Sequence, residues 1–572
     1  MNSKFNIEKN IYFMAIFIAL IGLFLIVIRS DRFLEFRYFT DSANAQVLSQ
    51  STEKLNELYE RPSFLMLVHE DDQSLATSIK GMLERLDKEV IEQSIEEPLS
   101  LTANYNGIII ATENLDALPD KELLIEYATS GGSIFFATRP SPGPSLSSLY
   151  QQLGIVEIGN FIENNGIELS HSFFDSSFSQ SFLSQQIRNS SLAVRLDVKT
   201  RLYANASDGT PLLWTVPLGS GKIIVFNGSM FSNSAQGALF IKGVQLMLPT
   251  FIYPVMNAKV TALEGFPFPI ASGRHEDGVT NEEYYRQNFW PNMERLEAKY
   301  DLNYTASYVA TFEDDVIDFN SNDLSSSQEN TDFYGRELIR MGGELAIQGY
   351  NHFPINRLAE EEILSQMQNV AQRINHALPN YQVQSYIPVK QSTPLDPVPT
   401  MQLVLPELQA VLVNVDHPTM QVDGVAVLPK TMSGFTSTEF TDWLVFNQVA
   451  ISGYFSQSIM PQSFLTNTSL EADMQDFGAF QKQLKKDVPW LRGMTLSSAA
   501  ETVKHYTFSH IYEEPTENGI TFHLDSLSQP SYFYFSTERS ITDTKNCEIQ
   551  KIGEDLYLVE VNDLTFEIGL DG

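Results

Sequence analysis

Short, continuously apolar runs alternate with amphipathic helical patterns through most of this 572-residue chain. Residues 64–68 form such a run and precede a helical pattern at 75–86, and the same order recurs at 105–112 and 121–129. Strands that are apolar on both faces are typical of parallel sheets covered by helices. The alternation therefore predicts an α/β protein, and the length predicts about three or four domains.

Changes in this pattern suggest where the domains begin and end. Residues 61–255 predict a doubly wound domain of the glutamine-amidotransferase-like or flavodoxin-like type, and strands alternate with helices again over 262–504. Short alternating strands over 505–572 predict a small, β-rich, sandwich-like domain. Residues 29–60 are polar and helix-prone, and we expect them to form a stalk.

One segment near the N-terminus is suited to a membrane. Residues 11–28 carry no charge and are about as long as a helix needs to cross the hydrocarbon core. We expect an uncleaved, single-pass transmembrane anchor in the cell membrane, with residues 1–10 in the cytoplasm and the bulk of the chain extracellular. A cleaved signal peptide is the alternative, although the small-residue triplet at 43–45 lies far beyond the apolar run.

Charge and cysteine content exclude several classes of function. A net charge of −34 argues against nucleic acid as a partner, because phosphate binding needs a concentrated basic surface. Cys547 is the single cysteine, so no internal disulfide can form, and it lies too far along the chain to be an amidotransferase nucleophile. Residues 219–222 (Gly-Ser-Gly-Lys) lack the upstream glycine of a nucleotide-binding loop and precede a strand, which favours a hairpin turn.

Two stretches carry candidate chemistry, and each is expected at the end of a strand. They are residues 274–278 (Arg-His-Glu-Asp-Gly) and 344–352 (Glu-Leu-Ala-Ile-Gln-Gly-Tyr-Asn-His), with a helix, a strand and a helix between them. This order resembles the NodB-like polysaccharide deacetylases, whose motifs read Thr-Phe-Asp-Asp-Gly and Glu-Ile-Gly-Asn-His-Thr-x-x-His. The resemblance implies a distorted (β/α) barrel over 262–504.

The resemblance also implies a metal site. In that family a divalent metal, usually zinc, polarises the acetamide and activates a water molecule. By correspondence Glu276 is the general base, and Asp277 and His352 are metal ligands. Gln348 occupies the other ligand position, where an amide oxygen is a weaker zinc donor than imidazole, and His275 is a substitute ligand.

Further correspondences fill in the rest of the site. Tyr350 and Lys390 are candidate substrate-binding residues, and Lys390 could replace the arginine missing from the third motif at 386–389. Residues 311–315 (Thr-Phe-Glu-Asp-Asp) are a rival first motif, but only one helix fits between them and the second motif. His417 is a further possible ligand.

The closest overall pattern is the PelA-type exopolysaccharide deacetylase branch, whose late motif reads Ser-His-Phe-x-His-Pro-Asp-Asp. Residues 456–463 (Ser-Gln-Ser-Ile-Met-Pro-Gln-Ser) replace both histidines and both acids, so the correspondence implies that the general acid is lost.

Two functions therefore remain open. The first is a metal-dependent N-deacetylase in Pel-like exopolysaccharide modification or export, with weak or lost activity. The second is a catalytically inactive, glycan-binding scaffold. Expected partners in both cases are an extracellular amino-sugar polysaccharide and other exopolysaccharide-assembly proteins.

Overall fold

The structure is a computed structural model, which describes residues 47–571 except for a few short segments. These segments are 60, 102–104, 171–173, 175–179, 269, 271, 276–277, 313–324, 390–394, 422, 464–469 and 529. Before residue 47 it describes only positions 13, 14, 16, 17 and 20, so most of the predicted anchor lies outside the described residues. Among the residues that are described, no helix is both long and apolar enough to span a bilayer.

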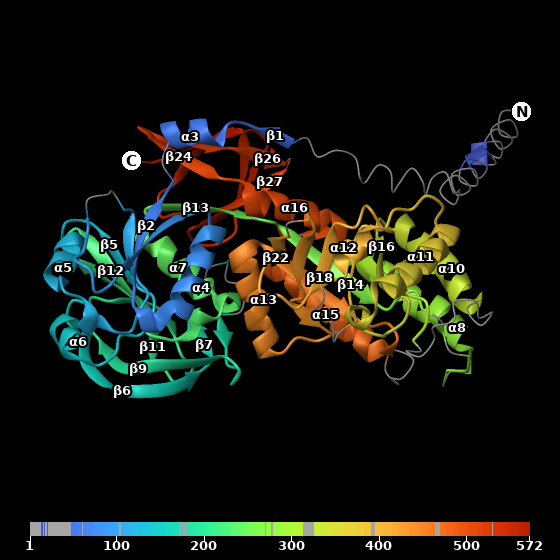
Figure 1. Cartoon of the computed structure of the whole chain (residues 1–572), viewed down its shortest axis with the longest axis horizontal. Helices are drawn as coiled ribbons and strands as arrows, with labels where there is room; N and C mark the ends of the chain where they lie inside the picture. Colours follow the sequence, from blue (N-terminus) through green and yellow to red (C-terminus); the bar gives the residue numbers. More distant parts are fainter. Residues whose placement is uncertain are drawn as a thin grey trace, which may run out of the picture.

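The first folded unit contains a nine-stranded sheet (Figure 1). Its strands are, in spatial order, β3 (Glu89–Ser94), β2 (Ser63–Val68), β4 (Gly107–Ile110), β5 (Ser133–Phe136), β12 (Gly221–Phe226), β11 (Pro211–Leu218), β10 (Arg201–Asn205), β7 (Ile167–Leu169) and β8 (Ser181–Phe182). The first five are parallel, and the rest extend the sheet antiparallel. An antiparallel ribbon of β6 (Ile155–Asn165) and β9 (Arg188–Leu196) lies beside it.

Helices cover both faces of the parallel strands. The helices of this unit are α4 (Gln73–Arg85), α5 (Lys121–Thr129), α6 (Pro144–Leu149) and α7 (Ala238–Met247). Successive side chains of a strand point to opposite faces, and in β4 Ile109 joins the core beneath α4 and α7 whereas Ile108 joins the core beneath α5. The mixed α/β architecture predicted from the alternation is confirmed.

The second unit is a curled sheet. Its strands are, in order, β19 (Thr419–Met420), β20 (Ala426–Pro429), β18 (Ala410–Val413), β17 (Ser385–Tyr386), β16 (Glu344–Gly349), β15 (Tyr304–Val309), β14 (Ala258–Glu264), β22 (Tyr454–Ile459) and β21 (Met432–Ser433), with β23 (Arg492–Met494) pairing with β14. Small and apolar side chains such as Ala262, Ala346 and Leu412 fill its interior. The sheet closes where the loop after β20 meets β22, because the Thr431 N–H donates a hydrogen bond to Ser456 Oγ (2.9 Å).

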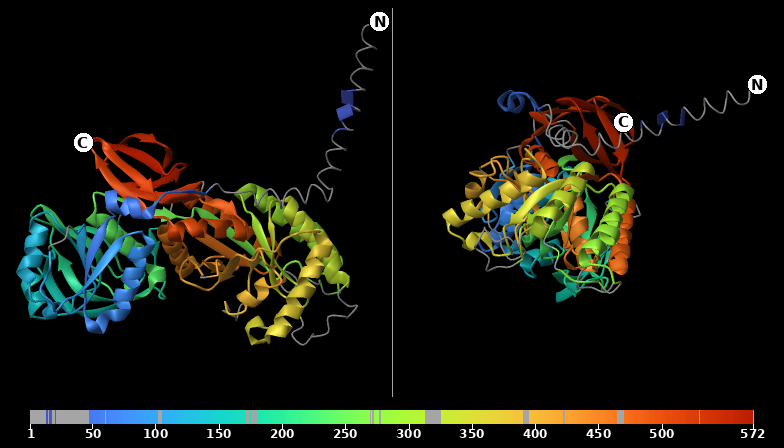
Figure 2. Two further views of the ribbon diagram at one scale, coloured as in Figure 1. Left: turned by 45° about the horizontal axis from the view of Figure 1, so that its top comes forward. Right: turned by 90° about the vertical axis from the view of Figure 1, so that its right-hand side faces the viewer.

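Helices surround the curled sheet, as both views in Figure 2 show. They are α8 (Asn281–Tyr284), α9 (Trp290–Tyr300), α10 (Ser325–Arg340), α11 (Glu360–Ala377), α12 (Val398–Gln402), α13 (Glu439–Ser452), α15 (Leu470–Asp487) and α16 (Leu496–Phe508). Trp443 and Phe446 of α13 share a core with α7, which joins this unit to the first one.

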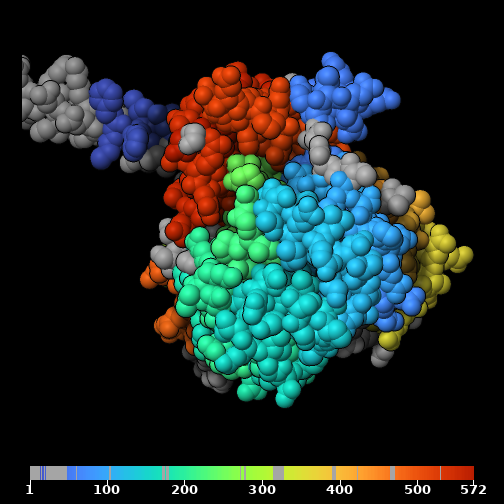
Figure 3. Space-filling view, turned by 90° about the vertical axis from the view of Figure 1, so that its left-hand side faces the viewer, coloured from blue at the N-terminus to red at the C-terminus, as the bar shows by residue number. Residues whose placement is uncertain are grey.

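The C-terminal unit consists of two four-stranded antiparallel sheets, which rest on the first unit in Figure 3. One contains β13 (Thr250–Val255), β27 (Ser531–Thr537), β30 (Leu556–Val561) and β29 (Cys547–Lys551), and the other contains β24 (Ile511–Thr516), β25 (Gly519–Leu524), β31 (Thr565–Leu570) and β28 (Ile541–Lys545). Phe522, Phe533 and Phe566 lie in the core that the sheets share.

Part of the segment predicted as a stalk packs on this C-terminal unit. Strand β1 (Val47–Ser49) pairs with β26 (Ser526–Ser528), and helix α3 (Thr52–Leu58) follows. Tyr59 stacks on His523 with ring centroids 4.1 Å apart. Such contacts join residues more than 400 positions apart, and no local pattern in residues 29–60 could indicate them.

Candidate functional site

Parallel strands of the curled sheet end together at one end of the barrel. In β14, Ala258, Val260 and Ala262 face the interior, and the period of two along a strand directs Glu264 inward as well. Glu264 is aligned with Ser307 of β15, and the Ser307 hydroxyl accepts a hydrogen bond from the Gly265 N–H (3.1 Å). Carboxyl ends of parallel strands are the usual place for binding sites in such folds.

A buried ion pair occupies this end of the barrel. Lys430, directly after β20, places Nζ 2.6 Å from Oε1 of Glu264, and the two side chains are only 9% and 5% exposed. The Lys430 backbone N–H is fixed by the carbonyl of Val413 (2.8 Å). A charge is expensive to bury without a partner, so each side chain of the pair makes the burial of the other tolerable.

The second motif lies beside this pair. Gly265 has φ +65°, and a Cβ at this position would lie 3.1 Å from Oε1 of Gln348 and 3.8 Å from Nε2 of His352. The amide of Gln348 and the imidazole of His352 therefore approach the same point, at the end of β14. The ring of Phe312 contacts that of His352 edge to face, with centroids 4.7 Å apart.

Two buried oxygen atoms at this end make no hydrogen bond within the described part of the chain. They are Oε1 of Gln348 and Oγ of Ser458 in β22, and both residues are almost fully buried, at 3% and 2% exposure. An unsatisfied buried polar group costs about 1–3 kcal/mol. Both oxygens are therefore available to a ligand.

The loop of the predicted first motif is only partly described. Glu276 and Asp277 lie outside the described residues, so their roles stay predictions. The ring of His275 stacks on Tyr284 with centroids 3.7 Å apart, and an isolated bridge pairs Arg274 with Thr280. This loop does not follow a strand directly, because β14 ends at Glu264.

The strand expected directly before residues 274–278 is not found among the described residues between 265 and 273. The last strand before the motif is β14, and its paired residues end at Leu263 on one side and Glu264 on the other. Pro267 and Pro269 offer no N–H to a neighbouring strand, which disfavours pairing beyond this point. Sequence reasoning consequently missed Glu264, although Glu264-Gly265 directly after an apolar run was a usable signal. Lys430 gave no such signal.

The remaining predicted site residues are Tyr350, Lys390 and His417, and Tyr350 and His417 have different environments. Tyr350 is fully buried, and its carbonyl accepts hydrogen bonds from the N–H groups of Ala310 and Thr311 (3.0 Å each). Lys390 lies outside the described residues, as do positions 313–315 of the rival motif. His417 lies 3.1 Å from the Arg85 guanidinium, and burial, with a smaller effect from Arg85, lowers the pKa of His417 to about 4.

Glu344, the first residue of β16, lies at the opposite end of the barrel. Its carboxylate accepts hydrogen bonds from Ser385 Oγ (2.5 Å) and from the Ser497 N–H (3.0 Å) in the first turn of α16. Burial raises the pKa of Glu344, although these hydrogen bonds act in the other direction. Glu344 also borders a polar cavity of about 610 Å³.

The described residues, which do not include Glu276 and Asp277, do not by themselves form the zinc site that the resemblance implies. In the part of the chain that the structure describes, no three His, Cys, Asp or Glu side chains are grouped as metal ligands. The carboxylate of Glu264 already has a cation, the Lys430 ammonium, and Gln348 offers only an amide oxygen. Zinc sites use thiolate, imidazole and carboxylate donors, and here only His352 is an unambiguous donor.

Comparison with known proteins identifies the family. The family described as "Uncharacterised protein conserved in bacteria (DUF2194)" matches residues 175–558. The chain belongs to this family. No curated protein matches the sequence.

Several of the solved structures that match are described as carbohydrate or polysaccharide deacetylases, and others are a mannosidase and β-galactosidases. Agd3, described as a novel carbohydrate deacetylase, is 12% identical and has a TM-score of 0.56, over 89% of this chain and 98% of its own. A putative polysaccharide deacetylase from Mycobacterium smegmatis aligns over 44% of this chain and 92% of its own, at 12% identity and a TM-score of 0.29. A mutant of BA3943, described as a CE4 family pseudoenzyme with restored enzymatic activity, aligns over 43% and 69%, at 10% identity and a TM-score of 0.26. The similarity to Agd3 confirms the fold that the resemblance to the polysaccharide deacetylases predicts.

Proposed function

We propose that this protein binds an extracellular amino-sugar polysaccharide at the carboxyl end of its barrel and does not deacetylate it by the metal-dependent route. The observation that carries the proposal is the buried Glu264–Lys430 ion pair. An ammonium group supplies a positive charge but has no open coordination position, so it cannot generate a hydroxide from a bound water as a metal does.

The late motif supports the same reading. In β22 and the turn after it, the positions of the two histidines and two acids of the PelA-type motif hold Gln457, Met460, Gln462 and Ser463. Met460 has no acidic proton, and the other three offer only amide or hydroxyl groups. Hydroxyl and amide groups do not exchange protons near neutral pH, so they cannot protonate a leaving amine. They do form hydrogen bonds, and sugar hydroxyl and acetamido groups are suitable partners for Oε1 of Gln348 and Oγ of Ser458.

A metal-dependent deacetylase is the second candidate. It is favoured by the imidazole of His352 at the barrel end and would use Asp277 as a further ligand and Glu276 as the base. Zinc, if bound, would act as the Lewis acid that this chemistry needs.

Location and context belong to the same proposal. We propose that residues 11–28 anchor the chain in the cell membrane, that the bulk is extracellular, and that the protein works with other proteins of a Pel-like exopolysaccharide assembly. The uncharged 18-residue apolar run supports the anchor. Membrane fractionation and protease treatment of intact cells test it: release into the soluble fraction, or full protection of the ectodomain, would contradict it.

The decisive experiment compares glycan binding with acetate release by the purified full-length chain. We expect retention on a poly-N-acetylgalactosamine-type polymer without acetate release, and weaker retention of Gln348→Ala. Gln475→Ala, on the exposed face of α15, is the matched control and should bind normally. Acetate release that is lost in Asp277→Ala would favour the enzyme, and no retention of the unaltered chain would reject the binding proposal.

A further inference from the structure

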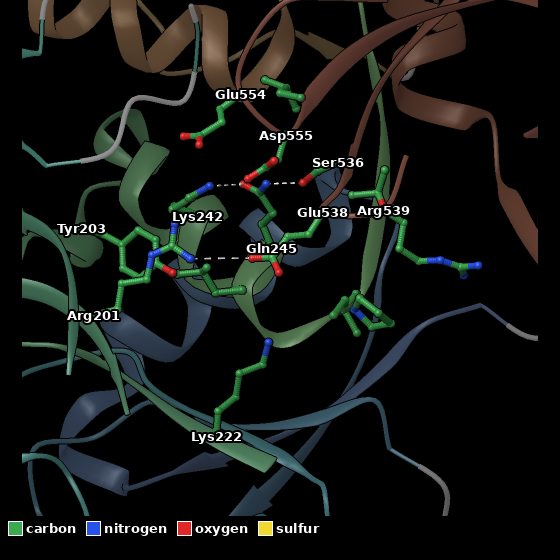
Figure 4. A pocket seen from close by; sticks show the side chains of 15 residues that line it. Arg201, Tyr203, Lys222, Lys242, Gln245, Ser536, Glu538, Arg539, Glu554 and Asp555 are labelled. Atoms are coloured by element: carbon green, nitrogen blue, oxygen red, sulfur yellow. Dashed lines mark hydrogen bonds and ion pairs between the residues drawn. The ribbon is translucent and has the colours of Figure 1, made fainter. Parts of the chain in front are cut away.

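A second candidate site lies far from the barrel end, between the first unit and the C-terminal sheets (Figure 4). It is a pocket of about 290 Å³, bordered on one side by β10, β12 and α7 and on the other by β27 and the turn between β29 and β30. Ligand sites usually measure roughly 300–1,000 Å³. The pocket is therefore large enough for one small ligand.

Three basic side chains reach this pocket from three different elements. They are Arg201 of β10, Lys222 of β12 and Lys242 of α7, and Figure 4 shows their charged ends directed toward its centre. Lys222 follows the β11–β12 hairpin turn at Gly219, which has φ +61° and confirms the hairpin predicted for residues 219–222. Such convergence is notable in a chain with a net charge of −34.

The Lys222 ammonium makes no hydrogen bond or ion pair within the part of the chain that the structure describes. Burial lowers the pKa of Lys222, and Glu538 offsets this only in part. Lys222 is therefore partly removed from water without a direct partner, which is unfavourable for an ammonium group.

The neighbouring cations are only loosely compensated. Arg201 lies 3.9 Å from Glu538, and these two side chains are 50% and 77% exposed, so solvent weakens their attraction. The Lys242 ammonium donates to the neutral amide oxygen of Gln245 (3.1 Å), and the amide N–H of Gln245 donates to the Ser536 hydroxyl. An entering anion could thus contact Arg201 and Lys222 without breaking a buried ion pair.

We propose that this pocket binds the oxyanion of a small ligand, a phosphate or a carboxylate group, between Lys222, Lys242 and Arg201. Its acidic residues, Glu538, Glu554 and Asp555, belong to the C-terminal unit and lie on the opposite wall. A bound anion therefore contacts basic groups of the first unit, and ligand groups that donate hydrogen bonds face the carboxylates. Such a ligand links two units that are far apart in sequence.

Calorimetric titration of the full-length chain at pH 6.5 tests the proposal, with inorganic phosphate and glucuronate as separate probes and glucose as the neutral control. We expect saturable binding of at least one anion, no binding of glucose, and at least tenfold weaker binding by Lys222→Met. Lys199→Met removes a half-exposed lysine of the same unit that is not in the pocket, and it should bind as the unaltered chain does. Binding of phosphate alone would indicate a phosphoryl ligand, and binding of glucuronate would indicate a sugar acid.

A second arm uses pH. Burial is the main cause that lowers the pKa of Lys242 to about 8, with Asp555 opposing and Arg201 adding to the effect. Glu538 and Glu554 also face Lys242, and their charges oppose the effect of burial on the Lys242 pKa. Glucuronate binding should therefore weaken between pH 6.5 and 9, as Lys242 loses its proton while the glucuronate carboxylate keeps its charge.

Three results would overturn the proposal. The first is the absence of saturable binding of either anion at millimolar concentration. The second is equal affinity of Lys222→Met and Lys199→Met. The third is a lower melting temperature of Lys222→Met combined with no anion binding by the unaltered chain. The basic residues would then serve only to hold the two units together by attraction to the carboxylates opposite. None of these outcomes depends on glycan binding at the barrel end, so the two proposals fail independently.

Discussion

Replacing Lys430 by methionine tests the importance of the buried pair at the barrel end. Lys430→Met keeps most of the apolar stem and removes the ammonium group, which leaves the Glu264 carboxylate without its cation. At the observed separation of 2.6 Å, Coulomb's law gives roughly 6 kcal/mol at an effective dielectric constant of about 20. Desolvation offsets much of this attraction, and loss of one partner from a buried pair costs about 3–5 kcal/mol.

Thermal unfolding followed by circular dichroism measures this cost. For a unit of about 250 residues, each kcal/mol lowers the melting temperature by about 2–4 °C, so we expect a decrease of about 6–20 °C for the transition of the barrel unit. Lys485→Met removes an exposed lysine of α15 and serves as the control, with an expected change near zero. The double variant Glu264→Gln/Lys430→Met should regain part of the loss, because no buried charge remains.

The reasoning would be refuted by either of two results. One is a Lys430→Met melting temperature equal to that of Lys485→Met. The other is a double variant no more stable than Lys430→Met, since the destabilisation would then come from lost packing of the lysine stem and not from the unpaired Glu264 carboxylate.

Three further predictions concern other parts of the fold. Gly265→Ala should lower the free energy of unfolding by more than the ~1–2 kcal/mol expected for an alanine in the left-handed region, because its Cβ would lie 3.1 Å from Oε1 of Gln348. Gly209→Ala is the control: Gly209 has φ +85° and nothing within 4 Å of an added Cβ, so this variant should show only the conformational cost. Denaturant unfolding measures both. His510→Gln should lower the melting temperature more at pH 6 than at pH 9. The hydrogen bond to Asp87 raises the pKa of His510 in the folded chain. The stability that protonated His510 contributes is therefore complete below the pKa of histidine in the unfolded chain and is lost as the pH rises through the folded-state pKa. The stability of Glu344→Gln relative to the unaltered chain should increase as the pH is raised from 4 to 8. The pKa of Glu344 is raised in the folded chain, so ionisation of this carboxyl destabilises the unaltered chain but cannot occur in the variant. A stability difference that stays constant across this range would contradict the prediction.

Local patterns predicted the elements that are defined by their own residues. The run at 64–68 forms β2, the helical pattern at 121–129 forms α5, and the short alternating strands expected over 505–572 include β25, β27 and β30. In each case a continuous apolar run or a clear period of apolar residues marks a face that must be buried.

Pairings between distant segments could not be predicted in this way. Strand β13 was assigned with the first unit, yet it pairs with β27, which begins at Ser531. The antiparallel strands β7, β8, β10 and β11, which extend the first sheet, were likewise not expected. Register and partner choice depend on which surfaces meet in three dimensions, and a single sequence does not encode that in any local signal.

The candidate site illustrates the same limit. Gln348 and His352 were found because they are four positions apart, as are the two histidines in the second motif of the deacetylase family. The ion pair of Glu264 with Lys430 joins residues 166 positions apart, and neither is marked by a motif. Glu264 was also overlooked because the order of elements before the second motif placed the first motif at residues 274–278, although β14 had already ended.

The most direct test of the central claim is the zinc content per chain after dialysis, measured on the unaltered protein and on Gln348→His/Lys430→Met. The account predicts less than about 0.1 zinc per chain for the unaltered protein, since a lysine neutralises the carboxylate and an amide replaces an imidazole. It predicts about one zinc for the double variant, in which Glu264, the new imidazole and His352 would supply the three ligands. One zinc per unaltered chain, retained in Glu264→Gln and lost in Asp277→Ala, would contradict the account.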